Sequence, residues 1–433
     1  MSLRNRELLT LLAVAVLTGL GFASVYIARQ AEISAGSLTY AVFFLAVYAV
    51  AHLAARFATP NADPYLVPIA GLLTAAGVTE IYRLNPQDAL RQSIWIVIAA
   101  ALFSITLWAF RKDYRTLERY KYLLGLGSIV LLLLPALPVI GTTINGARLW
   151  VRVGPLQFQP GEIAKLMLIV FLAAYLREKR EVLAKGRLKD FGPLLMIWGV
   201  AMLTLLATND LGSALLYFGI FLAMLYAATG RSLFVALGLL LFAAGGYGAH
   251  HYVGHVRERI TIWLHPWTTQ PVPCAFNGQL ALRQDCASYQ LVKSLYSNSH
   301  GGIGGAGLGK GTFTNASGGE LIPFLKTDFI YSALAQELGL IGVAGVVLVY
   351  MLFTLRGFRV AHVAQDGFSK LLATGLTFGF ALQTFIILGG VLRIIPLTGI
   401  TLPFISYGGS SVVANFVLVA GLLLVSHRAN SRS

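Results

Sequence analysis

The sequence predicts an all-α polytopic integral membrane protein with about 12 transmembrane helices and one long extracellular loop before the tenth helix. Hydrophobic residues make up 57% of the 433 residues and charged residues only 12%, which leaves too little polar surface for a soluble globule of this length. The apolar residues also fall into runs of about 18 to 25, the length that a helix needs to cross roughly 30 Å of hydrocarbon.

Each predicted span is an apolar run with few charges. Glu80, Arg83 and Arg91 crowd the connection between two spans, so a shallow hairpin is an alternative for that pair. The first span follows Arg4 and Arg6 without a small-residue cleavage site, so we expect a retained helix and not a cleaved signal peptide. The predicted spans are residues 7–28, 38–57, 64–83, 91–110, 120–140, 160–177, 191–208, 211–229, 232–253, 327–356, 368–393 and 408–427.

The distribution of basic residues sets the predicted orientation. Short loops on one side of the spans are rich in Lys and Arg, which is typical of the cytoplasmic side, so both termini are predicted to be cytoplasmic. The basic residues of these loops are Arg111, Lys112, Arg115, Arg119, Lys121, Arg177, Lys179, Arg180, Lys185, Arg187, Lys189, Arg231, Arg356 and Arg359.

The net charge of +15 does not indicate a nucleic-acid partner. Most of the excess lies in the short loops, where membrane orientation and anionic lipid explain it. No span shows the ligand spacing of a zinc, haem or iron–sulfur site. We therefore expect no nucleic acid and no haem.

The connection at about residues 254–327 is much longer than the others, which indicates a function of its own. It holds Cys274 and Cys286, for which an oxidising exterior favours a disulfide, with two free thiols as the alternative. Residues 301–311 are glycine-rich, but Lys310 is followed by Gly311 where a Walker A motif needs Ser or Thr. We expect no nucleotide, and glycines that let backbone approach a ligand or a helix closely.

Two opposite charges enter the predicted sixth span together. Glu162 and Lys165 lie three residues apart on one helix face, just after Pro160. A charge near the bilayer centre costs on the order of 3 kcal/mol, so we expect the pair to face the protein interior or a wet cavity. A structural ion pair near the interface is the alternative.

Other polar residues lie at the exterior ends of the spans. Arg148 belongs to a segment at 145–152 that alternates basic and aromatic residues, and an arginine on this side suits an anionic phosphate. An interfacial anchor in the headgroup plane is the alternative. Asp210 lies in a tight turn, where capping is by itself the simpler role.

Asp328 lies where the long loop joins the tenth span. A carboxylate at a cavity mouth can act as a general base, and N-capping by Thr327 or Asp328 is an equal alternative.

Near the end of the chain, residues 395–411 hold two prolines and three glycines in an apolar context. Such backbone at membrane depth must be buried in protein or line a cavity.

Together these stretches resemble the SEDS family of bacterial cell-wall proteins, whose members include RodA, FtsW and SpoVE. The resemblance covers the chain from about residue 91 to the C-terminus. The motifs that carry it are Gly146-Ala147-Arg148-x-Trp150, Gln159-Pro160-x-Glu162-x-x-Lys165, Asp210-Leu211-Gly212, the glycine stretch, Thr327-Asp328-Phe329-Ile330, Glu337-Leu338-Gly339 and Pro396-x-Thr398-Gly399 through Ser406-Tyr407-Gly408-Gly409-Ser410-Ser411.

The last motif looks most like the RodA branch, and the cysteine-bearing insert and extra N-terminal spans look like actinobacterial-type members. We therefore expect accessory transmembrane helices at 1–90 and a SEDS catalytic membrane domain at 91–433. Gly161, Asn209 and Arg393 depart from the residues usual in the family.

The resemblance implies a peptidoglycan glycosyltransferase of the bacterial cytoplasmic membrane. Its substrates would be lipid II, the undecaprenyl-pyrophosphate disaccharide pentapeptide, and nascent glycan, joined at the outer face for cell elongation and shape. The family's essential carboxylate falls on Asp328. A class B penicillin-binding transpeptidase is the implied partner.

The resemblance also implies roles for further residues. Arg148 and Lys165, with a divalent cation (Mg²⁺ or Mn²⁺), would stabilise the leaving pyrophosphate. Glu162 and Asp210 would position Lys165 or a metal. The remaining substrate-binding candidates are Lys326, Thr327, Ser406 and Ser410.

Two other functions are rivals. A flippase for the lipid-linked precursor would also have many helices, intramembrane charges and broken helices. It needs access from both faces, however, whereas the polar residues gather at the exterior ends. A non-catalytic scaffold for a transpeptidase is the second rival.

Overall fold

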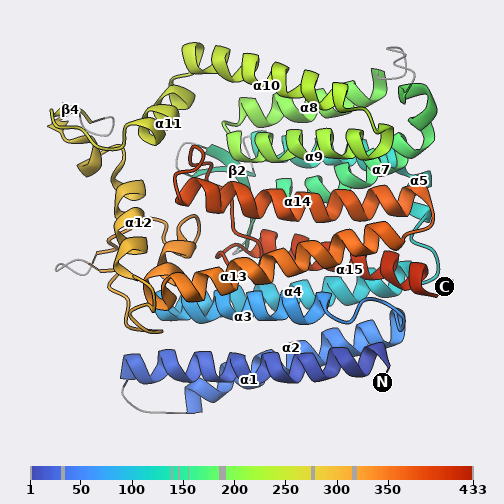
Figure 1. Ribbon diagram of the computed structural model, residues 1–433, viewed down its shortest axis with the longest axis horizontal. Helices are drawn as coiled ribbons and strands as arrows, with labels where there is room; N and C mark the ends of the chain where they lie inside the picture. The colour runs from blue at the N-terminus through green and yellow to red at the C-terminus, as the bar shows by residue number, and fades with distance from the viewer. Residues whose placement is uncertain are drawn as a thin grey trace.

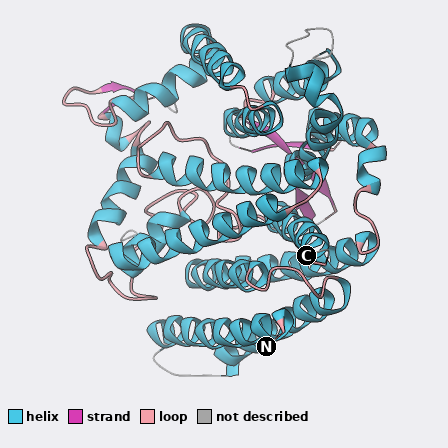
Figure 2. Cartoon of the chain, turned by 45° about the vertical axis from the view of Figure 1, so that its right-hand side comes forward, coloured by secondary structure: helices cyan, strands magenta, loops and turns pink. Residues whose placement is uncertain are grey.

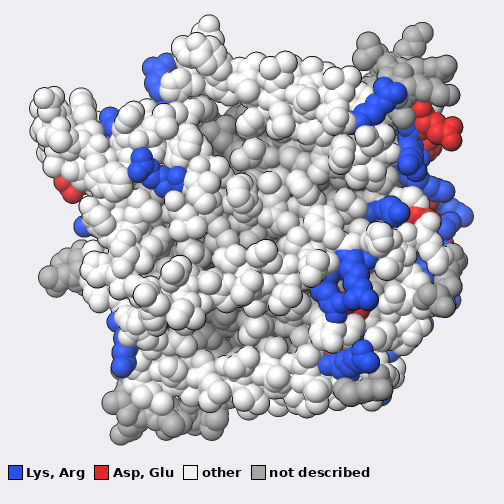
Figure 3. Space-filling view, in the orientation of Figure 1, with Lys and Arg blue, Asp and Glu red and all other residues white. Residues whose placement is uncertain are grey.

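The structure is a computed structural model, described for residues 2–30, 35–137, 140–144, 147–154, 156–184, 192–274, 278–314 and 319–431. Figure 1 shows long helices lying side by side, with both termini at one end of the molecule and the long connection at the other. On the face in Figure 3, Lys, Arg, Asp and Glu gather toward the two ends and leave a broad uncharged band between them. A molecule that spans a bilayer needs such a band.

All of the predicted spans coincide with helices, which confirms the nearly all-helical membrane fold. Among the described residues, eight helices are long and apolar enough to cross a membrane, and α6 and α8 are shorter apolar helices. Helix α3 carries charged residues near its C-terminal end, and α7 carries them near both ends. The helices at the predicted spans are α1 (Leu3–Gln30), α2 (Ala35–Ala58), α3 (Leu66–Leu84), α4 (Pro86–Phe110), α6 (Lys121–Leu133), α7 (Pro160–Ala184), α8 (Gly192–Ala207), α9 (Leu211–Thr229), α10 (Ser232–Tyr252), α13 (Ile330–Val363), α14 (Gly367–Val391) and α15 (Gly409–Asn430). Two short helices, α5 (Thr116–Arg119) and the 3-10 turn η1 (Leu134–Ala136), flank α6.

Helix α15 is the centre of the bundle. It packs against α4, α7, α13 and α14, and most of its residues are buried. Helix α10 is the opposite case, since Gly238 is the one residue along it that is buried. It packs against α9 and α11 at the edge of the molecule, where lipid would cover its apolar side chains.

Polar residues begin several helices at the positions that the sequence marks. The Asn85 side chain accepts hydrogen bonds from the backbone of Gln87 and Asp88, and Pro86 occupies the first turn of α4. Asp366 caps α14 in the same way through the Ser369 N–H. These caps satisfy backbone donors that apolar surroundings would leave without partners.

A small antiparallel sheet joins α6 to α7, in the order β1 (Gly141–Ile144), β2 (Ala147–Val153) and β3 (Leu156–Phe158). Figure 2 shows its strands beside the helix ends. Residues 147–152 of the segment predicted to alternate basic and aromatic residues form a strand whose backbone pairs with strands on both sides. Positions 145 and 146 of the family motif, and the basic positions 185, 187 and 189, lie outside the described residues.

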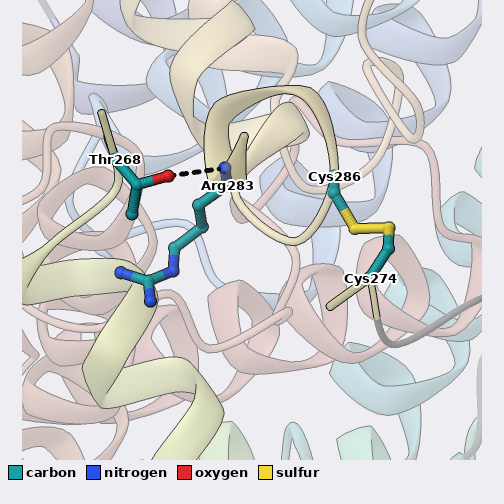
Figure 4. Close-up of a disulfide and its surroundings, with 4 residues drawn as sticks. All are labelled: Thr268, Cys274, Arg283 and Cys286. Atoms are coloured by element: carbon teal, nitrogen blue, oxygen red, sulfur yellow. Dashed lines mark hydrogen bonds between the residues drawn. A yellow bond between two sulfur atoms is a disulfide. The ribbon is translucent and has the colours of Figure 1, made fainter. Parts of the chain in front are cut away.

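The long connection is folded. It contains α11 (Gly254–Leu264), the strand pair β4 (Val272–Pro273) and β5 (Leu280–Ala281), the turn η3 (Arg283–Asp285) and α12 (Tyr289–His300). Cys274 and Cys286 form a disulfide with a Cα–Cα distance of 5.9 Å, so the bonded alternative is the one observed (Figure 4). The backbone N–H of Arg283 donates to the Thr268 hydroxyl beside it at 3.0 Å.

The glycine stretch inserts into a break in α13. Gly339 interrupts this helix with a φ of 67°, and the freed backbone groups bond to the stretch, with the Leu340 N–H donating to Gly302 and the Gly307 N–H donating to Glu337. The Glu337 carboxylate accepts the N–H groups of Gly309 at 2.6 Å and Gly311 at 3.0 Å. The expectation of a close backbone approach is confirmed, and the neighbour is a helix.

We expect Gly339→Ala to destabilise the protein. A methyl group there would collide with the backbone of Gly305, and the positive φ disfavours any residue with a side chain, so we expect a cost of roughly 1–3 kcal/mol. Thermal unfolding in detergent measures this. Gly345→Ala in the same helix is the matched control, because no atom lies within 4 Å of the added methyl group. Equal midpoints for the two variants would contradict the account of the break.

Candidate active site

Asp328 lies in a tight turn immediately before α13. The Phe324 carbonyl, at a left-handed residue with φ 62°, accepts the N–H groups of Thr327 and Asp328, both at 3.1 Å. The Ser406 hydroxyl donates to the Thr327 carbonyl at 2.5 Å and fixes this turn to the non-helical segment 392–408. Helix α13 begins after Phe329 without a side-chain cap, so the capping alternative for Thr327 and Asp328 is not realised.

Arg259 of α11 faces Asp328 across Gly399. A Cβ atom at Gly399 would lie 3.7 Å from Asp328 Oδ2 and 3.9 Å from Arg259 Nη2, so both charged groups border the same small space. Gly399 has a φ of 75°, which favours glycine. The Arg259 guanidinium also donates to the Leu397 carbonyl at 2.6 Å, which holds the helix to the segment.

Burial raises the pKa of Asp328 to about 6, while the Thr327 hydrogen bond and the Arg259 charge pull it down. Burial likewise lowers the pKa of Arg259, and the charges of Asp328 and Asp210 oppose that shift. An arginine stays protonated under such shifts. The pair is therefore a fixed cation beside a carboxylate that gains its proton only in mildly acidic solution.

The position of Arg259 depends on a second arginine. Arg393, a left-handed residue with φ 59°, donates from Nε to the Trp263 carbonyl at 2.7 Å and from Nη2 to the Leu264 carbonyl at 2.9 Å. The Trp263 indole N–H returns a bond to the Arg393 carbonyl at 3.1 Å. These contacts satisfy the C-terminal carbonyls of α11 and fix its orientation.

Asp210 begins α9 next to the same segment. Its side chain accepts the Ser213 N–H at 2.9 Å, so the capping role is observed. Burial raises the pKa of Asp210, and the charges of Glu162 and Arg259 also act on this carboxylate. The first turn of α9 requires glycine at position 212. A Cβ atom there would collide with the Thr398 carbonyl and the Ile400 side chain.

Glu162 and Lys165 form an ion pair of 2.8 Å at the start of α7. Lys165 is buried and also donates to Gln383 Oε1 of α14 at 2.6 Å, and the Gln383 amide donates to the Thr401 carbonyl at 3.0 Å. The charges face the protein interior, as predicted. This network links α7 and α14 to the segment that carries Gly399.

The other candidate residues are held by specific partners. Lys326 Nζ lies 2.6 Å from Asp88 Oδ2 of α4 and stays partly exposed. The Ser406 hydroxyl accepts the Leu402 N–H, and the Ser410 hydroxyl accepts the Gln159 N–H at 2.7 Å. Both serines are buried and hold backbone in place.

Arg148 lies apart from this group. Its guanidinium donates to the Leu137 carbonyl at 3.0 Å, and its side chain lines a separate cavity of about 450 Å³ between α6 and α8. No described contact joins it to Lys165 or Asp328, so the structure does not gather the two predicted pyrophosphate ligands in one place.

Sequence reasoning missed Arg259, Asp88 and Gln383. Arg259 had a usable signal, because it closely follows a predicted span on the side predicted to be exterior, where arginine is unusual. Asp88 and Gln383 had none, since their roles depend on partners more than 200 residues away in sequence.

Among the described residues, no group of three or more His, Cys, Asp or Glu side chains is arranged to hold an ion. Asp328 and Asp210 each face a guanidinium charge, which is a poor environment for a bound cation.

Backbone strain concentrates around Asp328. Four residues other than glycine have positive φ in the described chain, and all four flank the groups above: Asn209, Phe324, Arg393 and Phe404. Such conformations cost about 1–3 kcal/mol each and are common at functional sites.

The chain is similar to known proteins over most of its length. The sequence model of the FtsW, RodA and SpoVE family, described as cell cycle protein, matches residues 66–431, which leaves α1 and α2 before the match. The peptidoglycan glycosyltransferase RodA of Mycobacterium tuberculosis strain H37Rv is 37% identical, over 98% of this chain and 91% of that protein. The probable peptidoglycan glycosyltransferase FtsW of Geobacter metallireducens is 34% identical, over 84% of this chain and 95% of that protein.

Solved structures show the same fold. A chain from a study of the structural coordination of polymerization and crosslinking by a peptidoglycan synthase complex gives a TM-score of 0.68 at 28% identity, over 86% of this chain and 99% of that chain. The rod shape determining protein RodA of Thermus thermophilus gives a TM-score of 0.59 at 27% identity, over 85% of this chain and 97% of that chain.

Proposed function

Because this chain belongs to the FtsW, RodA and SpoVE family and is a peptidoglycan glycosyltransferase, we propose that it polymerises lipid II. We further propose that Asp328 is the general base of this reaction. One observation carries the assignment of residues. Asp328 and Arg259 border one space at Gly399, so a proton acceptor and a permanent cation stand where a sugar hydroxyl and a pyrophosphate would meet.

The proposed step is a single displacement. The 4-hydroxyl oxygen of the acceptor sugar attacks the anomeric carbon of the donor, and the bond from that carbon to the pyrophosphate oxygen breaks. Ionised Asp328 takes the hydroxyl proton, and the pyrophosphate leaves on its polyprenyl carrier. One carboxylate suffices because pyrophosphate leaves without protonation, and the anomeric configuration inverts.

Arg259 is the cation best placed to stabilise the leaving group. Its planar fork can make two hydrogen bonds to phosphate oxygens. Lys165 is less suited, because the Glu162 carboxylate already balances its charge and it is buried. We therefore assign Glu162, Lys165 and Gln383 to positioning the segment around Gly399.

We also propose that this site faces the cell exterior and that both termini are cytoplasmic. The termini lie together at the end opposite the long connection, which is the arrangement that an even number of spans requires. Basic loops at the end with the termini and a disulfide at the other end support this orientation.

We expect Asp328→Asn to lower the rate of lipid II polymerisation by about 10²–10⁴-fold, the range for loss of a general base. The wild-type rate should fall as the pH drops through about 6, because Asp328 must be ionised to accept the proton. Arg259→Gln should lower the rate and shift this acidic fall in rate to higher pH, since the Arg259 charge holds the Asp328 pKa down. The measurement is glycan chain formation by purified protein across pH.

Two exposed residues of the same connection serve as controls. Asp285→Asn and Arg257→Gln remove the same charges outside the site and should keep the wild-type pH profile. Full polymerisation by Asp328→Asn would overturn the proposed base. Lipid II movement between leaflets without any glycan product from wild-type protein would favour the flippase rival instead.

We propose that a divalent cation used in the reaction arrives with the pyrophosphate and is not resident in the protein. The absence of a suitable side-chain cluster in the described residues supports this. We expect a chelator to slow polymerisation and added Mg²⁺ or Mn²⁺ to restore it, while elemental analysis of the purified protein finds neither metal. A stoichiometric metal that survives purification would contradict this proposal.

We propose a class B penicillin-binding transpeptidase as partner, because a solved relative comes from a peptidoglycan synthase complex. Gly375 and Gly379 of α14 lie four residues apart, a spacing that can serve either as a docking surface for a partner helix or for packing inside the bundle. Both glycines are buried against Ile169, Ile220 and Met224, so internal packing is observed.

We expect a penicillin-labelled transpeptidase to co-purify with the tagged chain from native membranes, and to do so equally with Asp328→Asn. An unrelated membrane protein with the same tag is the control. Equal labelling in the control would count against the complex.

A further inference from the structure

A basic cleft lies at the end of the molecule that holds the termini, far from Asp328 along α13. It has a volume of about 170 Å³ and lies between the start of α1, the turn from α2 to α3, and the ends of α13 and α15. Its lining includes three arginines, Arg6, Arg356 and Arg359, and one carboxylate, Asp63. On the face in Figure 3, two neighbouring groups of basic side chains lie toward this end.

The floor of the cleft is a firmly held turn. The Asp63 N–H donates to the Ser426 hydroxyl at 2.9 Å, and the Asn61 N–H donates to His427 Nδ1 at 3.2 Å. Buried Arg4 donates to the carbonyls of Ala62 and Asp63 from the other side. The turn therefore joins α1 and α15, and the cleft has a fixed shape.

The three arginines of the cleft differ in what balances their charge. Arg356 lies over the Tyr65 ring at 4.2 Å, and its Nε is 3.6 Å from Asp63 Oδ2. Arg6 and Arg359 are exposed, and among the described residues neither forms a salt bridge with a carboxylate. Two positive charges therefore converge on the cleft from α1 and α13 without a protein counter-ion.

We propose that this cleft binds the phosphate of an anionic phospholipid, with Arg6 and Arg359 as its ligands. The position favours a lipid over a free anion, because Leu3, Val360 and Val363 also line the cleft at the end of membrane-spanning helices. The headgroup would contact the arginines while the acyl chains follow the apolar helix surfaces.

The general excess of basic residues on the cytoplasmic side does not by itself account for this arrangement. That rule concerns the number of Lys and Arg in loops, whereas Arg6 and Arg359 are more than 350 residues apart and meet at one cavity. The bound lipid would bridge α1, which precedes the family match, to α13, which begins beside Asp328. It would therefore stabilise the attachment of α1 and α2 to the rest of the bundle.

Native mass spectrometry of the full chain in detergent tests this, with phosphatidylglycerol and phosphatidylcholine of the same acyl chains as probes. We expect wild-type protein to retain phosphatidylglycerol preferentially. The double variant R6A/R359A should bind it about 30-fold more weakly, since a basic side chain near anionic lipid contributes about 1 kcal/mol. Arg231→Ala is the matched control, because it removes an exposed arginine from another loop at the same end and should leave binding unchanged.

The remaining outcomes overturn the proposal. If R6A/R359A and Arg231→Ala weaken phosphatidylglycerol binding equally, the lipid is attracted diffusely to a basic surface. If wild-type protein retains both lipids equally, the cleft does not recognise the headgroup. Displacement of the lipid by millimolar inorganic phosphate would identify a free-anion site. Polymerisation in neutral detergent should be unchanged in R6A/R359A, which shows that the variant is folded and that neither arginine takes part in the reaction.

Discussion

A non-helical chain segment buried among membrane-spanning helices must have its backbone groups satisfied by protein, because lipid offers no hydrogen bonds. Residues 400–408 form such a segment together with the more exposed residues 392–399, and side chains from several helices supply the bonds. Tyr350 of α13 donates to the Pro403 carbonyl at 2.5 Å, and Gln92 of α4 accepts the Gly408 N–H at 3.2 Å. Gln383 and Arg259 donate to the Thr401 and Leu397 carbonyls. The helices around the segment therefore cannot shift independently.

This constraint also builds the proposed reactive centre. The segment must turn back on itself, and Gly399 and Phe404 provide the left-handed conformations that the turn requires. Because Gly399 lacks a side chain, Asp328 and Arg259 come to border one space, although they arrive from different ends of the long connection. The same bonds that satisfy the backbone of this segment thus fix the Asp328 carboxylate and the Arg259 guanidinium relative to each other, which is the preorganisation that the proposed reaction needs.

The two ends of the molecule use charge differently. At the end with Asp328, several charges inside the protein have a partner of opposite sign, as in Glu162 with Lys165 and Asp88 with Lys326, which offsets the cost of a charge in apolar surroundings. At the end with the termini, Arg6 and Arg359 are exposed and lack such partners among the described residues. Water and anionic lipid can balance their charge there, so their cost is small.

The sequence by itself determined the membrane-spanning helices, the folded connection before α13, the disulfide as the favoured state and Asp328 as the candidate base. These features depend on local composition, on compartment chemistry or on motif resemblance, all of which are read along the chain. Only the tertiary structure decided that Arg148 lies apart from Asp328 and that Arg259 stands beside it. It also decided that Gly375 faces inward and that the glycine stretch fills a break at Gly339. Each of these depends on contacts between segments far apart in sequence, and a hydrophobic helix in a bundle carries no sequence periodicity that says which neighbour it meets.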